Sequence, residues 1–572
     1  MCTAHNICLL NGRKLGDLDG RCTYFGRNAS VIDVSIVDRH IFSHTIGFKV
    51  HPLTEHSDHC RIETILACKP HPVSSNDTCV DKLIFDKYIW NQSTSPEKLN
   101  HAMSDPFYND LKNKILSSKY PSSSAGCNKL CEDVSKLTKF LHEKSCEKRT
   151  IGKKSRAKAK RQKFFTPNCQ EMRQRVRRAA NFWYRNPFKP MARAEYFSLL
   201  RQYKKLVKKL KKEHLQKQLN QLISCLDTNE MWNILSDIKG KKSGAPIPIS
   251  DLHSHFSSIL NDVPKNVSES KLNSLQEKIL SFRENKSATT DSVSVPIANY
   301  SPLKLCKLAK KLKNGKSTFK DGFVNEVIKF SINDMSPIFV KLFNLIENSG
   351  SYPSAWNTSF LVPLHKSGCK SDPDNFRGLA VGSNVSKFYS LCLYDKLINF
   401  VESNNLSSPQ QFGFRENFRT NNAMFVLRSL ISAYKNRGSK PVYSCFVDFS
   451  KAFDSVDRTA LAYKLGNVGI RGSLLDLVIS MYEKTDYIIK SNGQFSVPFS
   501  SKFGVKQGCN LSPLFFNIFI NDIHEIFDKS CEPLKLDDWL VNSLSYADDL
   551  VLLSETESGL QSSLNKLENY CN

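Results

Sequence analysis

The chain has 572 residues, of which 40% are apolar and 10% aromatic, and its formal net charge is +26 at pH 7. This apolar content supports a sizeable core and excludes a wholly disordered chain. No apolar run approaches the ~18 residues of a membrane-spanning helix, and no signal peptide follows Met1, so we expect an intracellular protein, nuclear and/or cytoplasmic, with no membrane partner.

The N-terminal segment, residues 1–68, is rich in β patterns. Residues 30–37 alternate apolar and polar side chains, which predicts a half-buried strand. Residues 69–299 are interpreted as a linker, because clusters of Ser, Asn and Pro such as residues 121–124 recur there. A basic helical region, residues 144–217, interrupts this linker.

Most of the excess positive charge lies in that basic region, which contains 25 Lys and Arg and four Glu. Residues 153–161 lack the apolar residues of a core and predict a flexible arm. Residues 192–226 show helical periodicity, with Lys and Arg between the apolar positions. Because so few acids are present to form salt bridges, a phosphate-rich partner is favoured over an ordinary solvated face. Four aromatic residues could stack on bases: Phe164, Phe165, Trp183 and Tyr184.

Two apolar β patterns, about a hundred residues apart, carry acidic residues. The first, residues 443–449, brings Asp448 near its end, and the second contains the adjacent Asp548 and Asp549. Neighbouring strand residues point to opposite faces, so the adjacent acids can converge only at a tight turn, which predicts a hairpin with both at its tip. The alternative is a polar turn between two core strands. Buried acids repel unless a divalent cation binds them, and two Mg²⁺ ions held by Asp carboxylates suit in-line phosphoryl transfer.

Residues 446–454 and 546–549 resemble motifs A and C of reverse transcriptases, in the form typical of the non-LTR (LINE-type) retrotransposon group. The resemblance covers residues 300–556. It implies an α+β fold, with the fingers and palm of a right-hand polymerase, and an RNA-directed DNA polymerase that adds dNTPs to a DNA primer on an RNA template. The chain stops 23 residues after Asp549, so we expect the domain at 300–572 to be truncated after motif C, with the thumb absent.

Residues 504–517 resemble motif B of the same family. A glycine-punctuated loop runs into a helix, for which Ser512 is the expected N-cap and Pro513 the first helical residue. We also expect Asp454 and Asp457 to cap the helix that follows them.

The resemblance assigns roles by position. Three carboxylates are implied as the catalytic, metal-binding residues for two Mg²⁺ ions: Asp448, Asp548 and Asp549. Five residues are implied in binding the incoming nucleotide: Lys366, Arg377, Phe453, Gln507 and Gly508. The planar fork of Arg377 would clamp the triphosphate. The ring of Phe453 would exclude a 2′-hydroxyl and thereby favour dNTPs. The alternative is that Phe453 is an ordinary core aromatic, and the two interpretations can coexist.

Ser57-Asp58-His59 resembles the closing motif of the exonuclease-endonuclease-phosphatase family, in which the His contacts the scissile phosphate and the neighbouring Asp orients the imidazole. Asp33 lies in a segment that stands in the expected order before this motif. The early strands and metal ligands of that family would precede Met1, so we expect residues 1–68 to be a catalytically inactive remnant, a partial α/β sandwich. The alternative function for the whole chain is an inactive nucleic-acid-binding relic.

Overall fold

The structure is a computed structural model, in which the chain forms two compact units, each built from two segments. The first unit is Met1–Ser75 with Lys154–Ser243, and the second is Asn76–Lys153 with Gly244–Asn572. Apart from a few single positions, the described residues are 7–11, 21–25, 29–31, 33–52, 59–67, 85–151, 164–225, 247–261, 269–284, 300–436, 441–536 and 538–571. Within these ranges, no helix combines the length and the apolar character that a membrane span requires.

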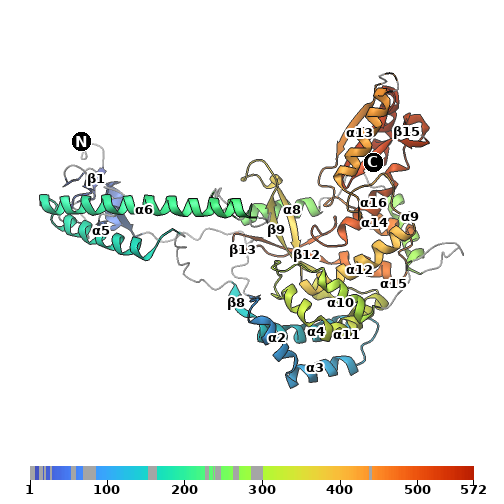
Figure 1. The fold of residues 1–572 in the computed structure, drawn as a ribbon, viewed down its shortest axis with the longest axis horizontal. Helices are drawn as coiled ribbons and strands as arrows, with labels where there is room; N and C mark the ends of the chain where they lie inside the picture. Colours follow the sequence, from blue (N-terminus) through green and yellow to red (C-terminus); the bar gives the residue numbers. More distant parts are fainter. Residues whose placement is uncertain are drawn as a thin grey trace. The chain divides into compact units, whose positions relative to one another are not determined.

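The first unit combines short antiparallel strand pairs with a helical hairpin. The strand pairs are β1 (Ile7–Leu9) with β4 (Ile36–Asp38), β2 (Tyr24–Phe25) with β3 (Ala29–Ser30), and β5 (Thr45–Val50) with β6 (Ile62–Leu66), and α1 (Arg39–His44) precedes β5. The hairpin consists of α5 (Pro167–Arg185) and α6 (Pro190–Ser224), which lie side by side (Figure 1). The basic helix predicted for residues 192–226 is therefore confirmed as α6.

The strand predicted over residues 30–37 is wrong. β3 ends at Ser30 and β4 begins only at Ile36. Between Ser30 and Ile36, backbone groups that would pair with a neighbouring strand form hydrogen bonds with side chains instead. The amide of Asp33 donates to Thr23 Oγ1 at 2.9 Å, and Asn11 donates to the Asp33 carbonyl and accepts from the Ser35 amide. Local side-chain bonds of this kind compete with regular secondary structure.

The core of the first unit joins its strands to its helices. Trp183 on α5 is fully buried, and its ring packs edge-on against Phe25 on β2 at 5.1 Å. The hydroxyl of Tyr184 donates to the carbonyl of Val50. The prediction that Trp183 stacks on bases is therefore wrong, because the ring has no open face. The arm at 153–161 lies outside the described residues.

The helices at the start of the second unit correct the linker prediction. α2 (Ser95–Met103), α3 (Pro106–Ser117) and α4 (Ser124–Ser145) share one apolar core with α11 (Asn325–Ser349), beside which they lie in Figure 1. The Ser and Pro cluster at 121–124 is the start of α4, where the hydroxyl of Ser123 accepts from the Gly126 amide. Residues with a strong turn preference act here as a helix cap.

A buried histidine links α4 to the segment before α11 through two hydrogen bonds. His142 Nδ1 donates to the carbonyl of Thr138, and its Nε2 accepts from the backbone amide of Val324 at 2.9 Å. Burial lowers the pKa of His142 to about 4, so the ring is neutral at pH 7 and can accept this bond. Segments almost 200 residues apart are thereby joined.

Two sheets organise the remainder of the second unit. The larger has the order β10-β9-β12-β13, with β14 also paired to β12, and β9 runs antiparallel to β10 and parallel to β12. Its strands are β9 (Thr358–His365), β10 (Phe376–Val381), β12 (Thr485–Ser491), β13 (Gln494–Phe495) and β14 (Phe499–Ser501). The smaller, which we call the acidic sheet, has the order β11-β18-β17: β11 (Tyr443–Asp448), β17 (Ser543–Tyr546) and β18 (Asp549–Ser554).

Helices and short ribbons surround these sheets. The helices are α8 (Ile249–Asn261), α9 (Glu269–Arg283), α10 (Pro302–Lys310), α12 (Asn384–Ser403), α13 (Thr420–Asn436), α14 (Arg458–Asn467), α15 (Ser473–Glu483), α16 (Ser512–Ile520) and α17 (Glu557–Cys571). Two further strand pairs are β7 (Phe85–Ile89) with β8 (Glu147–Ile151), and β15 (Leu534–Leu536) with β16 (Trp539–Val541).

The central strand of the acidic sheet is buried on both faces. Val551 and Leu553 pack with Leu430 of α13, whereas Leu550 and Leu552 pack against the α17 side. The sequence of a strand that is covered on both faces is typically a continuous run of apolar residues. This burial holds Asp549, at the start of β18, at a fixed place on the edge of the core.

Candidate active site

The two acidic segments meet at one end of the acidic sheet. β11 pairs antiparallel with β18, and in this register Asp448 stands directly opposite Asp549. β17 pairs with β18 so that Tyr546 is opposite Asp549, which leaves Ala547 and Asp548 as a two-residue turn. The predicted hairpin with both acids at its tip is confirmed. Ala547 has a φ of +57°, the left-handed conformation that such tight turns require.

Buried Gln411 holds this turn in place. Its side-chain oxygen accepts from the amides of Ala547 and Gly413, at 2.9 and 2.7 Å, and its Nε2 donates to the carbonyl of Ala547. A Cβ atom at Gly413 would lie only 2.2 Å from the Ala547 nitrogen, so glycine is needed there. No sequence pattern indicated either role, because the contact joins residues about 135 positions apart.

The donor set of the three carboxylates suits a hard cation such as Mg²⁺, which prefers oxygen ligands. Backbone pairing brings Asp448 and Asp549 face to face, with Asp548 next along the chain. Within the described residues, however, no three acidic, His or Cys side chains are gathered closely enough to form a finished metal site. Backbone pairing thus brings the three residues to one end of the acidic sheet, and their role as metal ligands stays a prediction.

The two basic candidates lie on the β9–β10 hairpin. Arg377 is exposed on β10, opposite Leu364, and Lys366 follows β9, where its amide donates to the carbonyl of Asn375 at 2.8 Å. β10, the strand that carries Arg377, also contains Ala380, whose amide donates to the backbone carbonyl of Gln507 at 2.8 Å. The strand that carries Arg377 is therefore attached to the loop that carries Gln507 and Gly508.

Phe453 is partly buried between two other aromatic rings. It stacks on Phe516 of α16, with centroids 4.6 Å apart and an interplanar angle of 15°, and meets Phe414 edge-on at 6.0 Å. Its carbonyl accepts from the amide of Val505 at 2.9 Å. The ring thus packs as a core aromatic and retains an accessible part, as both interpretations of this residue require.

Three predicted helix caps have different outcomes. Asp457 caps α14, because its carboxylate accepts from the Ala460 amide at 2.7 Å. Asp454 caps no helix and instead accepts two bonds from Gln507. Ser512 is the first residue inside α16 rather than its cap, and its hydroxyl donates to the Lys506 carbonyl. The last two predictions are wrong because both side chains bind the loop of residues 504–508.

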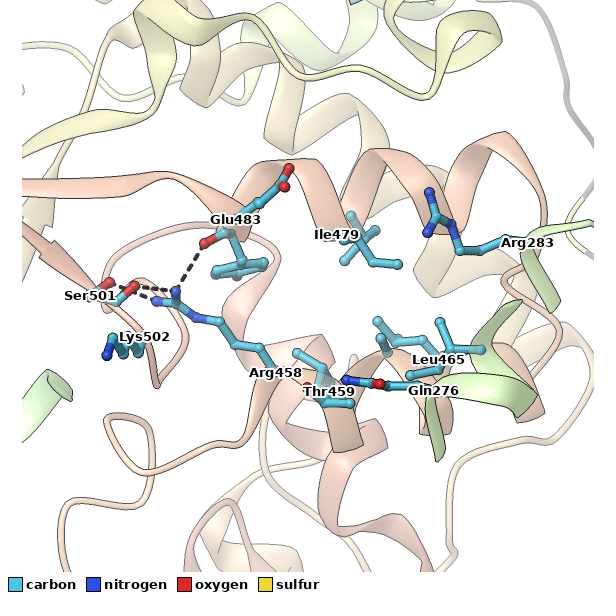
Figure 2. A pocket seen from close by; sticks show the side chains of 14 residues that line it. Gln276, Arg283, Arg458, Thr459, Leu465, Ile479, Glu483, Ser501 and Lys502 are labelled. Carbon is cyan, nitrogen blue, oxygen red and sulfur yellow. Dashed lines mark hydrogen bonds between the residues drawn. The ribbon is translucent and has the colours of Figure 1, made fainter. Parts of the chain in front are cut away.

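Arg458 binds the beginning of the same loop and the residues before it, although its sequence context gave no indication of this role. Its guanidinium donates to the carbonyls of Tyr482, Ser501, Phe503 and Gly504 at 2.6–3.0 Å and to the Ser501 hydroxyl at 2.7 Å. Burial lowers its pKa, and none of its hydrogen-bond partners among the described residues is a carboxylate. Figure 2 shows it at one end of a cavity of about 430 Å³, with Arg283 at the other end.

In the first unit, His59 has an acidic partner other than its neighbour in sequence. Its Nδ1 lies 2.8 Å from Asp33 Oδ2, and its ring lies 4.9 Å from that of Tyr24. Asp58 lies outside the described residues. The structure therefore brings together two of the three residues of the predicted endonuclease remnant, and that assignment stays a prediction.

The helical hairpin of the first unit carries a basic surface. α6 contains nine Lys and Arg but only Glu195 and Glu213 as acids, and Glu213 lies 3.9 Å from Lys209. Its exposed basic residues are Arg201, Lys204, Lys205, Lys208, Lys209, Lys211, Lys212 and Lys217. A face with so few opposite charges suits a polyanionic ligand.

Comparison with known proteins identifies a family to which part of the chain is similar. The family described as "Reverse transcriptase (RNA-dependent DNA polymerase)" matches residues 364–572. The "Retrovirus-related Pol polyprotein from type-2 retrotransposable element R2DM" of Drosophila melanogaster is 28% identical over 40% of this chain and 21% of its own length. The "Probable RNA-directed DNA polymerase from transposon BS" of the same organism is 23% identical over 50% of this chain and 32% of its own length.

The chain thus spans about a fifth to a third of the curated relatives it matches. Among solved structures, apo telomerase from Candida tropicalis, truncated from its C-terminal domain, matches with a TM-score of 0.29 and 11% identity. That alignment covers 57% of this chain and 89% of the telomerase chain.

Proposed function

We propose that the chain is an RNA-directed DNA polymerase, because residues 364–572 match the reverse transcriptase family and are similar to polymerases of retrotransposable elements. It adds dNTPs to the 3′-hydroxyl of a primer on an RNA template. The observation that carries the proposal is the pairing of Asp448 opposite Asp549, with Asp548 at the adjoining turn. Asp448 and Asp549 are exposed and Asp548 is partly exposed at this end of the sheet, so oxygen ligands for a divalent cation are accessible there.

These carboxylates would hold Mg²⁺, which when bound supplies the charge that activates a primer hydroxyl and neutralises the leaving pyrophosphate. The pairing register of β11 and β18 brings Asp448 opposite Asp549, and this register would determine where the two residues bind the ion. Arg377 and Lys366 bind the triphosphate from the β9–β10 hairpin, Arg377 as a planar fork. The bond from Ala380 to Gln507 keeps this hairpin in register with the loop that contacts the nucleotide.

The experiment that tests the function is primer extension by the purified chain. A DNA primer annealed to an RNA template should be extended when the complementary dNTP and Mg²⁺ are both present, and EDTA should stop the reaction. A chain that binds the hybrid tightly but adds no complementary nucleotide would support the alternative, an inactive nucleic-acid-binding relic.

Substituting Phe453 should change sugar selection. In Phe453→Val the side chain that would exclude a 2′-hydroxyl becomes smaller. The incorporation of an rNTP relative to the matching dNTP should therefore rise by at least about tenfold, which is the usual size discrimination of an apolar pocket. Single-nucleotide incorporation on one template measures this ratio. Phe453→Tyr keeps the ring and should leave the ratio near that of the unmodified chain, and equal ratios in both variants would make Phe453 a core residue only.

The basic face of α6 should bind nucleic-acid phosphates. Deleting α5 and α6 would expose the core around Trp183, so the informative change is neutralisation of exposed lysines. Replacing Lys204, Lys205, Lys208 and Lys209 by Gln should flatten the slope of log affinity against log salt by ~0.7–0.9 for every phosphate that the variant no longer neutralises.

Filter binding of RNA and DNA at several salt concentrations measures this slope. The matched control replaces four exposed lysines of the second unit: Lys114, Lys119, Lys136 and Lys139. An equal change of slope in both variants would mean that net charge, rather than the α6 face, determines binding.

A further inference from the structure

Residues 186–191, which we call the hairpin turn, present two large apolar side chains to solvent. Phe188 is 85% exposed and Met191 is 86% exposed. The turn joins α5 to α6 at one end of the helical hairpin (Figure 1). Single exposed apolar side chains are common on protein surfaces, so the meaning of this pair depends on how the turn is held and on what surrounds it.

Hydrogen bonds to the fully buried Trp183 fix the shape of the hairpin turn. Trp183 Nε1 donates to the carbonyl of Pro187 at 3.3 Å. The amide of Asn186 donates to the carbonyl of Trp183 at 3.0 Å. Pro187 and Pro190 stand on either side of Phe188 in the sequence, and each proline ring restricts its backbone. The backbone that carries the exposed ring is thus restrained on both sides.

A basic cavity lies at the same end of α5. Its volume is about 560 Å³, and Asn181, Tyr184 and Arg185 of α5 line it together with Arg21 and Pro52. None of these residues is acidic. The guanidinium carbon of Arg21 lies 6.0 Å from the centroid of the Tyr184 ring. A guanidinium group binds phosphate through a planar fork, so two of them at one cavity suit a phosphate group.

Positive charge also surrounds the exposed ring along the chain. Residues 172–194 contain seven Lys and Arg and no Asp or Glu. Arg185 lies three residues before Phe188, and Lys189 follows it directly. Three residues of chain span at most about 11 Å, so the ring and the cavity are within reach of the same short stretch of a polyanion.

We propose that the hairpin turn is a base-stacking site, at which the ring of Phe188 stacks on an unpaired nucleic-acid base while Arg185 and Arg21 bind a phosphate of the same nucleic-acid strand. An aromatic ring beside cationic side chains binds single strands with little dependence on sequence. A base inside an intact duplex is already stacked on both faces, so the ring requires an unpaired base. The site goes beyond the proposed polymerase function, since it lies in the first unit.

An anionic membrane surface also attracts apolar side chains that stand among basic residues. Helices that bind membrane surfaces carry an extensive apolar face. The hairpin turn instead offers mainly Phe188 and Met191. One ring is enough to stack on a base, and the two arginines of the cavity suit the phosphate beside that base. These features favour a nucleic-acid strand.

The first experiment locates the contact in the full chain. A single-stranded oligonucleotide that contains iodouracil is irradiated in the presence of the chain, once as DNA and once as RNA. Iodouracil cross-links to an aromatic ring on which it is stacked, so mass spectrometry should find the cross-link in the peptide that contains Phe188. The strand that gives the higher yield identifies the preferred nucleic acid. The lack of this cross-link with both strands would overturn the inference.

The second experiment measures affinity by fluorescence anisotropy. Phe188→Ala should weaken binding of the single strand by about 5- to 150-fold, the range that stacking on one base contributes. The slope of log affinity against log salt should not change, because no charge is removed. Phe188→Trp keeps an aromatic ring and should bind like the unmodified chain. Duplex of the same sequence should bind all three proteins equally.

The control for an exposed ring is Phe107→Ala. Phe107 lies on α3 of the second unit and is 59% exposed, so its loss should leave the affinity for the single strand unchanged. Phe188 is too exposed for its substitution to disturb the core. Equal effects of Phe188→Ala and Phe107→Ala, or unchanged binding by Phe188→Ala, would overturn the inference.

Arg185→Gln tests the phosphate contact. It should flatten the salt slope for the single strand by ~0.7, the value for one neutralised phosphate. The matched control is Arg175→Gln, which removes the same charge from an exposed position of α5 that does not line the cavity. Its slope should stay that of the unmodified chain. Equal slopes in the two variants would mean that net charge, rather than the cavity, binds the phosphate.

Co-sedimentation with vesicles of phosphatidylcholine and phosphatidylserine tests the membrane alternative. If Phe188→Ala reduces vesicle binding and leaves binding of the single strand unchanged, the inference is overturned. The proposed function fails in a different way. A chain that cross-links at Phe188 but never extends a primer retains the stacking site without the polymerase function. A chain that extends primers while Phe188→Ala binds single strands normally retains only the polymerase function.

Discussion

Asp448→Asn and Asp548→Asn are each expected to reduce Mg²⁺-dependent primer extension by at least about a thousandfold. The substitution preserves the shape of the side chain and removes one negative charge from a site built of carboxylates. Metal ions that stabilise transition-state charge contribute several kcal/mol, and about 4 kcal/mol corresponds to a factor of a thousand in rate. β11 and β18 are joined by backbone pairing along their whole length, so we expect the variants to fold normally.

The measurement is single-nucleotide extension at saturating dNTP, together with binding of the primer–template hybrid. Hybrid affinity should stay within a few-fold of that of the unmodified chain, because the basic surface lies on other elements. Asp528→Asn is the matched control: this carboxylate pairs with Lys566 at the surface and should leave the rate unchanged. Variants at Asp448 or Asp548 that retain full extension would remove those residues from the active site.

Lys396→Met is expected to lower the stability of the second unit by about 3–5 kcal/mol, the usual effect of leaving a charge buried without its partner. Lys396 on α12 pairs with Glu347 on α11 at 2.5 Å, with only 8% and 4% of their side chains exposed. The hydroxyl of Tyr300 also donates to Glu347. Without the ammonium group, the Glu347 carboxylate would have to stay charged in an apolar core or bind a proton.

Urea denaturation followed by fluorescence measures the change. Lys304→Met is the matched control, because Lys304 is 41% exposed and pairs with Asp395 at the surface, where such pairs contribute at most about 1 kcal/mol. In the double variant Lys396→Met with Glu347→Leu, most of the lost stability should return, since neither charge remains. Equal effects of Lys396→Met and Lys304→Met would contradict the role assigned to the buried pair.

Local patterns predicted those parts of the structure that depend on local geometry. The hairpin at Asp548 and Asp549 followed from the two-residue period of strands, and α6 from the helical spacing of its apolar residues. The residues that resemble motifs A and C are brought together by the pairing of β11 with β18.

Features that depend on distant partners could not be predicted. The burial of Trp183 requires Phe25, far earlier in the chain. Gln411 and Arg458 act through contacts to Ala547 and to residues 482–504, which no local pattern indicates. The linker interpretation failed because Ser123, in a cluster of turn residues, caps a helix that is stabilised by packing on α11.

Each unit is interrupted in sequence by part of the other. Residues 76–153 separate the strands of the first unit from the helices that cover them, and residues 154–243 separate α4 from α11. During synthesis, the strands around Phe25 therefore leave the ribosome well before α5, and α4 leaves it before α11. Contacts so far apart in sequence close large loops and form slowly. Apolar surface on the early segments consequently stays exposed until the later ones emerge, so we expect nascent chains of this protein to bind chaperones.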